Sequence, residues 1–285
     1  MQTAGRRPTT HLSPLTAFLM RRARRSRVSD RHDAIDELFS TRGLEADPVA
    51  RDADPHFPLR PFAADIPRDD LGNADGPIEE SETDRLFRHA LEASGRGRPS
   101  EAVVRYRAIL ELDPGHVGAR NNLSLLLDAA GDHDEALEHL DAAVNRAPDD
   151  VALLVSRGAV RARLKLYPEA ETDLRRAIRL QPGSAAAHFN LGLVLWRKGL
   201  PAEAITSLRK AIAIEADHPG AHFYLGEALH QAGDSPGALA ALERAALLTP
   251  ADPKIFQLAG RILDKLARPE DARAMYQRAR GARPS

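Results

Sequence analysis

Residues 187–217 read AHFNLGLVLWRKGLPAEAITSLRKAIAIEAD. Apolar residues recur here every three or four positions in two runs, and Gly199 lies between the runs with Pro201 just after it. This spacing is typical of amphipathic helices, and proline is well tolerated in the first turn of a helix because its missing N–H has no partner there. The stretch therefore predicts two helices joined by a tight turn.

The same pattern returns through most of the chain with a period of 34 residues. Prolines mark the period at Pro114, Pro148, Pro182 and Pro250. The period defines six units at 83–116, 117–150, 151–184, 185–218, 219–252 and 253–285. Position 20 of every unit is alanine, namely Ala102, Ala136, Ala170, Ala204, Ala238 and Ala272.

Two other positions of each unit have complementary sizes. Position 8 is small in every unit, as in Gly192, and position 24 is large, as in Leu208. A small residue lets the two helices of a unit approach closely, and the large residue fills the space beside it. Since neither helix can bury its apolar face alone, the units must stack. The sequence predicts an all-α fold, an α-solenoid of six helix-turn-helix repeats.

This pattern resembles the tetratricopeptide repeat family, and the resemblance covers residues 83–285. Ser81 is expected to cap the first helix. Arg157 and Arg161 stand at positions that the family usually fills with apolar residues. We expect their stems to lie on apolar surface and their charged heads in water.

The resemblance implies a concave groove lined by positions 2, 5, 9 and 12 of each first helix, which holds a peptide or partner protein. Asparagine at position 6 can hold a peptide backbone in this family. The alternative for the aromatic residues at position 5 is packing between repeats, and asparagine also belongs to the plain consensus. The candidate groove residues are Asn122, Phe189, Asn190, Leu193, Trp196, Arg197, Phe223, Tyr224, Glu227 and His230.

Residues 1–80 have a different composition from the repeats. Residues 1–29 hold seven arginines and no acidic residue, whereas residues 30–82 hold 15 acidic residues and five arginines. We expect a disordered arm over 1–80, basic in 1–29 and acidic and proline-rich in 30–80. The segment DAIDELF (33–39) places its apolar residues on one helical face, which could dock in a groove, such as that of its own chain, or be a transient helix.

Nothing in the sequence indicates catalysis. The chain lacks cysteine, and the motifs of zinc proteases, phosphate loops and nucleophile elbows are absent. We expect no enzyme activity, no cofactor, no metal site and no small-molecule substrate. The lack of a long apolar segment predicts a cytoplasmic protein, and the ratio of 35 arginines to five lysines is typical of bacteria with GC-rich genomes.

The sequence as a whole predicts a non-enzymatic scaffold that binds a peptide or partner protein in the groove. One alternative is that the arm tethers the solenoid to nucleic acid or an anionic membrane. The other is an accessory subunit of a separate catalytic protein. The arm contacts would come from Arg21, Arg22, Arg24, Arg25 and Arg27.

Overall fold

The computed structural model describes residues 81–282, and these form twelve α-helices without any strand. The first helices of the six pairs are α3 (Glu82–Gly95), α5 (Val117–Ala129), α7 (Val151–Arg163), α9 (Ala185–Arg197), α11 (Pro219–Gln231) and α13 (Pro253–Lys265). Their partners are α4 (Pro99–Leu112), α6 (His133–Arg146), α8 (Tyr167–Leu180), α10 (Pro201–Ile214), α12 (Ser235–Leu248) and α14 (Pro269–Gly281).

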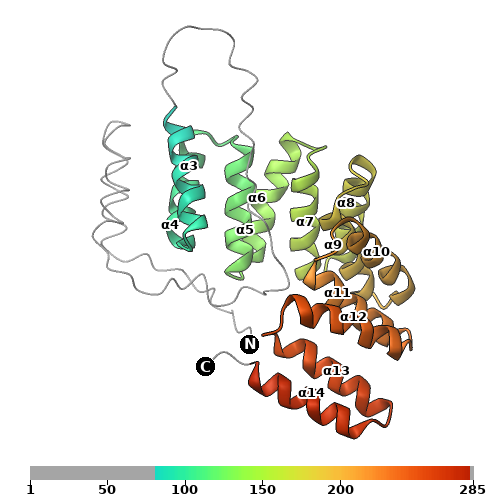
Figure 1. Ribbon diagram of the computed structural model, residues 1–285. Coiled ribbons are helices and arrows are strands. Elements are labelled where there is room, and N and C mark those ends of the chain that lie inside the picture. Colours follow the sequence, from blue (N-terminus) through green and yellow to red (C-terminus); the bar gives the residue numbers. More distant parts are fainter. Residues whose placement is uncertain (1–80, 283–285) are drawn as a thin grey trace, which may run out of the picture.

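The helices stack in chain order into a curved array, from α3 to α14 (Figure 1). Each helix packs against the next one in the chain, and successive first helices from α5 to α13 also contact one another. The first helices therefore form one continuous face of the array, which we call the inner face. This is the predicted all-α solenoid. The predicted arm lies outside the described residues.

Small residues at position 8 bring the two helices of a pair together, as predicted. A Cβ atom on Gly192 of α9 would lie 2.6 Å from the Leu208 Cγ atom of α10. The equivalent distances are 2.8 Å from Gly158 to Leu174 and 2.8 Å from Gly226 to Leu242. Such distances are shorter than carbon atoms adopt, so a Cβ atom at any of these three positions would force the facing leucine to shift.

The turn inside each pair contains one residue in the left-handed region of backbone conformation. Four of the six are glycines with φ between 70° and 89°, namely Gly97, Gly131, Gly199 and Gly233. The third and sixth pairs use Lys165 (φ 63°) and Ala267 (φ 55°) instead. Side chains with a Cβ atom are disfavoured there, so these two turns carry backbone strain.

Residues at the border between units cap the first helices. Ser81 accepts a hydrogen bond from the Asp84 amide at 3.1 Å, which confirms its prediction as an N-cap. His218 Nδ1 accepts one from the Ala221 amide at 3.2 Å. The caps of the other first helices are His116, Asp150, Ser184 and Asp252. Position 34 of each preceding unit therefore supplies a side-chain acceptor, even where that residue is histidine.

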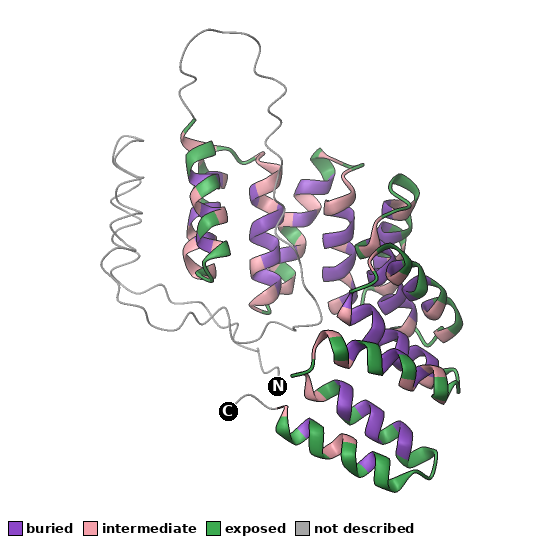
Figure 2. Ribbon diagram, viewed as in Figure 1, coloured by how far each residue is buried: buried purple, intermediate pink, exposed green. Residues whose placement is uncertain are grey.

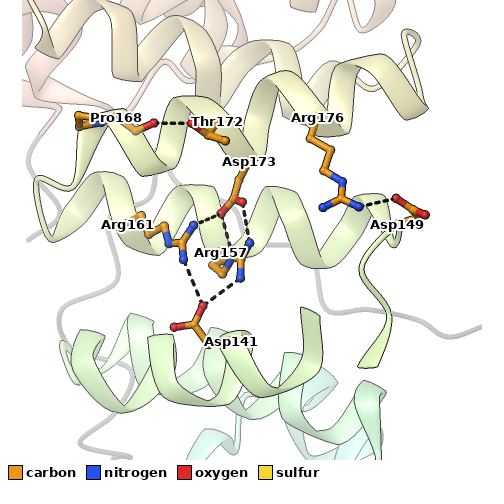
Figure 3. Close-up of polar contacts among 8 residues, drawn as sticks. All are labelled: Asp141, Asp149, Arg157, Arg161, Pro168, Thr172, Asp173 and Arg176. Atoms are coloured by element: carbon orange, nitrogen blue, oxygen red, sulfur yellow. Dashed lines mark hydrogen bonds and ion pairs between the residues drawn. The ribbon is translucent and has the colours of Figure 1, made fainter. Parts of the chain in front are cut away.

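Arg157 and Arg161 of α7 do not extend their charged heads into water, so that prediction was wrong. Both guanidinium groups donate hydrogen bonds to Asp173 of α8, whose side chain is 5% exposed, and to Asp141 of α6 (Figure 3). Burial opposes the charge of Arg157, but the two carboxylates hold its pKa above its usual value. This polar network joins three successive helices.

The core is a continuous layer between the helices. Buried residues line the facing sides of each pair, whereas most of α14 is exposed (Figure 2). Only Ala272 and Ala279 of α14 are buried. None of the helices between residues 81 and 282 is long and apolar enough to cross a membrane.

Candidate functional site

A pocket of about 730 Å³ opens at the end of the inner face where the first helices α9, α11 and α13 finish. We call it the Trp196 pocket. Its lining residues are Tyr167, Trp196, Arg197, Glu227, His230, Gln231 and Lys265. Successive first helices place side chains here because the 34-residue period brings the same helical position to the same edge in each unit.

Trp196 forms the aromatic wall of the pocket. The indole is half-buried and lies on Tyr224 of α11, with 5.4 Å between ring centroids. Tyr224 in turn contacts the ring of Phe223 at 5.2 Å. The aromatic contacts behind Trp196 hold its ring in place, so the pocket offers a rigid apolar surface.

Positive charge dominates the rim of the pocket. Arg197 lies 6.0 Å from the centre of the Trp196 ring, and Lys265 Nζ lies 3.2 Å from His230 Nε2. Neither Arg197 nor Lys265 forms an ion pair with a carboxylate among residues 81–282. These two cations are available to a carboxylate of a ligand.

Two titratable side chains of the pocket have shifted pKa values. Burial lowers the pKa of His230, and the positive charges of Lys265 and Arg261 lower it further. Burial raises the pKa of Glu227, although Arg261, 3.8 Å away, opposes this shift. The neutral form of His230 is favoured, and among residues 81–282 Glu227 is the only acidic residue that lines the pocket.

Most of the aromatic and aliphatic candidates are buried in the core. Phe189, Leu193, Phe223 and Tyr224 are all less than 10% exposed. The Phe189 ring packs on His218, with 4.5 Å between ring centroids. These four side chains pack beneath the surface of the inner face. The side chains that come together at its surface are Trp196, Arg197, Glu227 and His230.

The two candidate asparagines use their amide groups inside the protein. Asn122 donates to the Tyr106 hydroxyl at 3.2 Å, and Asn190 donates to the Ala186 carbonyl at 2.9 Å. Asn190 Oδ1 is buried and has no hydrogen-bond partner among residues 81–282. Desolvation raises the pKa of the buried Tyr106 hydroxyl to about 12, so this hydroxyl stays protonated. Asn122 thus links α5 to the preceding pair.

Sequence reasoning missed three residues of the pocket: Tyr167, Gln231 and Lys265. Gln231 and Lys265 follow Arg197 at intervals of 34 residues, so all three occupy position 13 of their units. Reading position 13 together with position 12 would have found them. Tyr167 begins the second helix α8, and the groove pattern of first helices gives no signal for it.

The remaining site predictions concern other parts of the molecule. Arg21, Arg22, Arg24, Arg25 and Arg27 lie outside the described residues. Within residues 81–282, no group of three histidine, aspartate or glutamate residues is arranged to hold a metal ion. His188 and His222 contact backbone carbonyl oxygens through Nε2, at 3.0 Å from Pro182 and 2.9 Å from Ala216.

The geometry defines an α-solenoid with a pocket on its inner face. Two family models match the chain, and both describe a tetratricopeptide repeat. One matches residues 157–219, and the other matches 93–158 and 195–262. Together they cover more than half of the sequence without a gap. The chain belongs to the tetratricopeptide repeat family.

Solved structures of bacterial proteins share this fold. PilF of Pseudomonas aeruginosa is 20% identical, with a TM-score of 0.59 over 70% of this chain and 97% of that one. TTC0263, a tetratricopeptide repeat protein of Thermus thermophilus, is 24% identical, with a TM-score of 0.53 over 65% and 99%. MamA of Desulfovibrio magneticus RS-1 is 22% identical, with a TM-score of 0.52 over 58% and 94%. No curated protein matches the chain significantly by sequence.

Proposed function

We propose that the chain is a non-enzymatic protein-interaction scaffold, and that its Trp196 pocket binds a segment of a partner protein. The observation that carries this proposal is the half-buried Trp196 ring beside two cations without carboxylate partners in the described residues. Tryptophan and arginine are the residues that most often dominate the binding energy of protein interfaces.

The pocket chemistry defines the kind of segment that fits. An apolar side chain of the partner would cover the Trp196 ring, and a nearby carboxylate would pair with Arg197 or Lys265. The helices that hold these residues are packed into the solenoid, so little ordering accompanies binding. Phe189, Leu193, Phe223, Tyr224, Asn122 and Asn190 then act indirectly, by holding the inner face in shape.

The test is affinity capture with variants of the intact chain, followed by titration of the purified partner. Trp196→Ala and Arg197→Ala are the test variants, since both side chains reach the pocket surface. Substitution of Phe189 would leave a cavity in the core, so that a loss of binding could result from lower stability instead of a lost contact. Leu247→Ala is the matched control, because this side chain is 69% exposed and does not line the pocket.

We expect a partner that intact protein and Leu247→Ala retain equally and that Trp196→Ala binds at least about tenfold more weakly, a typical loss for a tryptophan anchor. Retention of every partner by Trp196→Ala and Arg197→Ala would contradict the proposal. A chain lacking residues 1–80 distinguishes binding in the pocket from the alternative, binding through the arginine-rich arm. Binding through that arm would disappear with the arm and weaken steeply with salt.

A further inference from the structure

The Trp196 pocket presents an aromatic ring and a positively charged rim, and one segment of the same chain has the complementary composition. Arg197 and Lys265 contribute two positive charges to its rim, and Glu227 faces Arg261. An occupant with apolar side chains and several carboxylates would satisfy both the aromatic wall and the rim. Such an occupant would bind by combined apolar burial and charge pairing.

Residues 33–39, DAIDELF, have this composition. Three acidic side chains, Asp33, Asp36 and Glu37, alternate with apolar side chains that include Leu38 and Phe39, and no basic residue interrupts them. The surrounding stretch 30–82 is acidic as well, with 15 acidic residues against five arginines. Its charge is therefore opposite to that of the pocket rim.

The covalent connection is long enough for this segment to reach the pocket. About 40 residues separate Phe39 from Ser81, and a chain of that length extends up to ~140 Å. Because the two helices of each pair lie in separate layers, six pairs stacked at ~10 Å per pair make an array about 60 Å long. A tether of this kind gives an effective concentration up to the millimolar range, so even a weak contact becomes populated.

We propose that residues 33–39 occupy the Trp196 pocket of their own chain and that a partner binds only by displacing them. The apolar side chains of the segment cover Trp196, and its carboxylates pair with Arg197 and Lys265. This inference rests on the pocket being the ligand site of the proposed function. It adds that residues 33–39 compete with the partner for the Trp196 pocket.

Trp196 is the only tryptophan of the chain, so its fluorescence reports directly on the pocket. The experiment uses the full chain, the double variant Leu38→Ala/Phe39→Ala, and the control double variant Phe57→Ala/Phe62→Ala, which removes two phenylalanines elsewhere in the arm. A synthetic peptide of residues 30–42, which contains no tryptophan, is titrated into each protein. Circular dichroism verifies that all three retain equal helix content.

We expect the peptide to bind Leu38→Ala/Phe39→Ala at least about tenfold more tightly than it binds the intact chain or the control, because the intact pocket is already occupied. Equal affinity for all three proteins, or no binding to any, would overturn the proposal. Arg197→Glu should abolish peptide binding, and a peptide with Asp36→Arg and Glu37→Arg should restore it. Failure of this charge exchange also counts against the proposal.

Two further outcomes separate this inference from its alternatives. The tryptophan emission of the intact chain should not change with protein concentration, since the contact is within one chain. A change on dilution would show instead that arms exchange between copies. If the peptide does not bind while partner capture still depends on Trp196, the docking of residues 33–39 is wrong and the proposed function stands.

Discussion

The carboxylate of Asp173 on α8 receives two hydrogen bonds from the Arg157 guanidinium on α7, at 2.8 and 2.7 Å. Arg161 adds a third bond to the same carboxylate at 2.7 Å. Asp173 is 4% exposed, so these arginines take the place of water as its hydrogen-bond partners. A buried charge that loses its partners is costly, whereas loss of a whole charge pair often costs little.

We therefore predict that Asp173→Ala lowers the free energy of unfolding by about 3 kcal/mol, because two arginines lose their buried partner. The double variant Arg157→Met/Asp173→Leu should lose less than Asp173→Ala, since it also removes the Arg157 charge and leaves only Arg161, which keeps Asp141. Urea unfolding measures both. Thr172→Ala on the exposed side of α8 is the control and should change stability by less than about 0.5 kcal/mol.

Gly192 is predicted to be intolerant of a methyl group. The added Cβ atom of Gly192→Ala would meet Leu208 at 2.6 Å, and overpacking of this kind costs about 1–3 kcal/mol. Gly183→Ala is the matched control, because no other part of the chain between residues 81 and 282 lies within 4 Å of its Cβ position. Thermal unfolding should show a lower Tm only for Gly192→Ala. An equal Tm for the two variants would show that α9 and α10 can separate at no cost.

The strained turns at Lys165 and Ala267 predict stabilising substitutions. Lys165→Gly and Ala267→Gly should each raise the free energy of unfolding by roughly 0.5–1 kcal/mol, because relief of left-handed strain exceeds the entropy cost of glycine. The reverse change, Gly199→Ala (φ 75°), should lower it by about 1 kcal/mol. Chemical denaturation of the three variants tests this relation. Destabilisation by both glycine substitutions would contradict it.

His230 is predicted to titrate below its ordinary value of 6.5, since burial and then Lys265 and Arg261 disfavour its charged form. The unfolded chain binds this proton more tightly than the folded chain. The contribution of His230 to folding stability is therefore complete above about pH 6.5 and is lost as pH falls through the folded pKa. Histidine NMR titration measures that pKa. Lys265→Met should raise it, whereas Lys254→Met at the other end of α13 should not.

The periodic residues of the sequence predict the fold because packing within each pair repeats in every unit. Gly192 and Leu208 illustrate this, since their sizes complement each other wherever the unit recurs. The site is less predictable because exposure within one helix face depends on the neighbouring repeat. Phe189 at position 5 is buried beneath the next unit, and Asp128 and Ala162 at position 12 are buried too, whereas Trp196 at position 12 is only half-buried. Periodicity alone does not distinguish these two cases.

The sequence also did not predict the ion pairs between repeats. Arg163 of α7 contacts Asp128 of α5 at 2.7 Å, across 35 residues. Arg163 occupies position 13 and reaches back to an aspartate of the preceding unit. Arg197 occupies the same position of its own unit, but it pairs with no carboxylate among residues 81–282. Whether a cation at this position is structural or available to a ligand is decided by the residue one unit earlier.

The capping acceptors at position 34 determine where the chain can be divided. His218 belongs by count to one unit but completes the first turn of the next helix, α11. A fragment that starts at Pro219 loses this acceptor, whereas a fragment that starts at His218 retains it. Designers who recombine or truncate these units should move each junction one residue upstream of the numerical repeat.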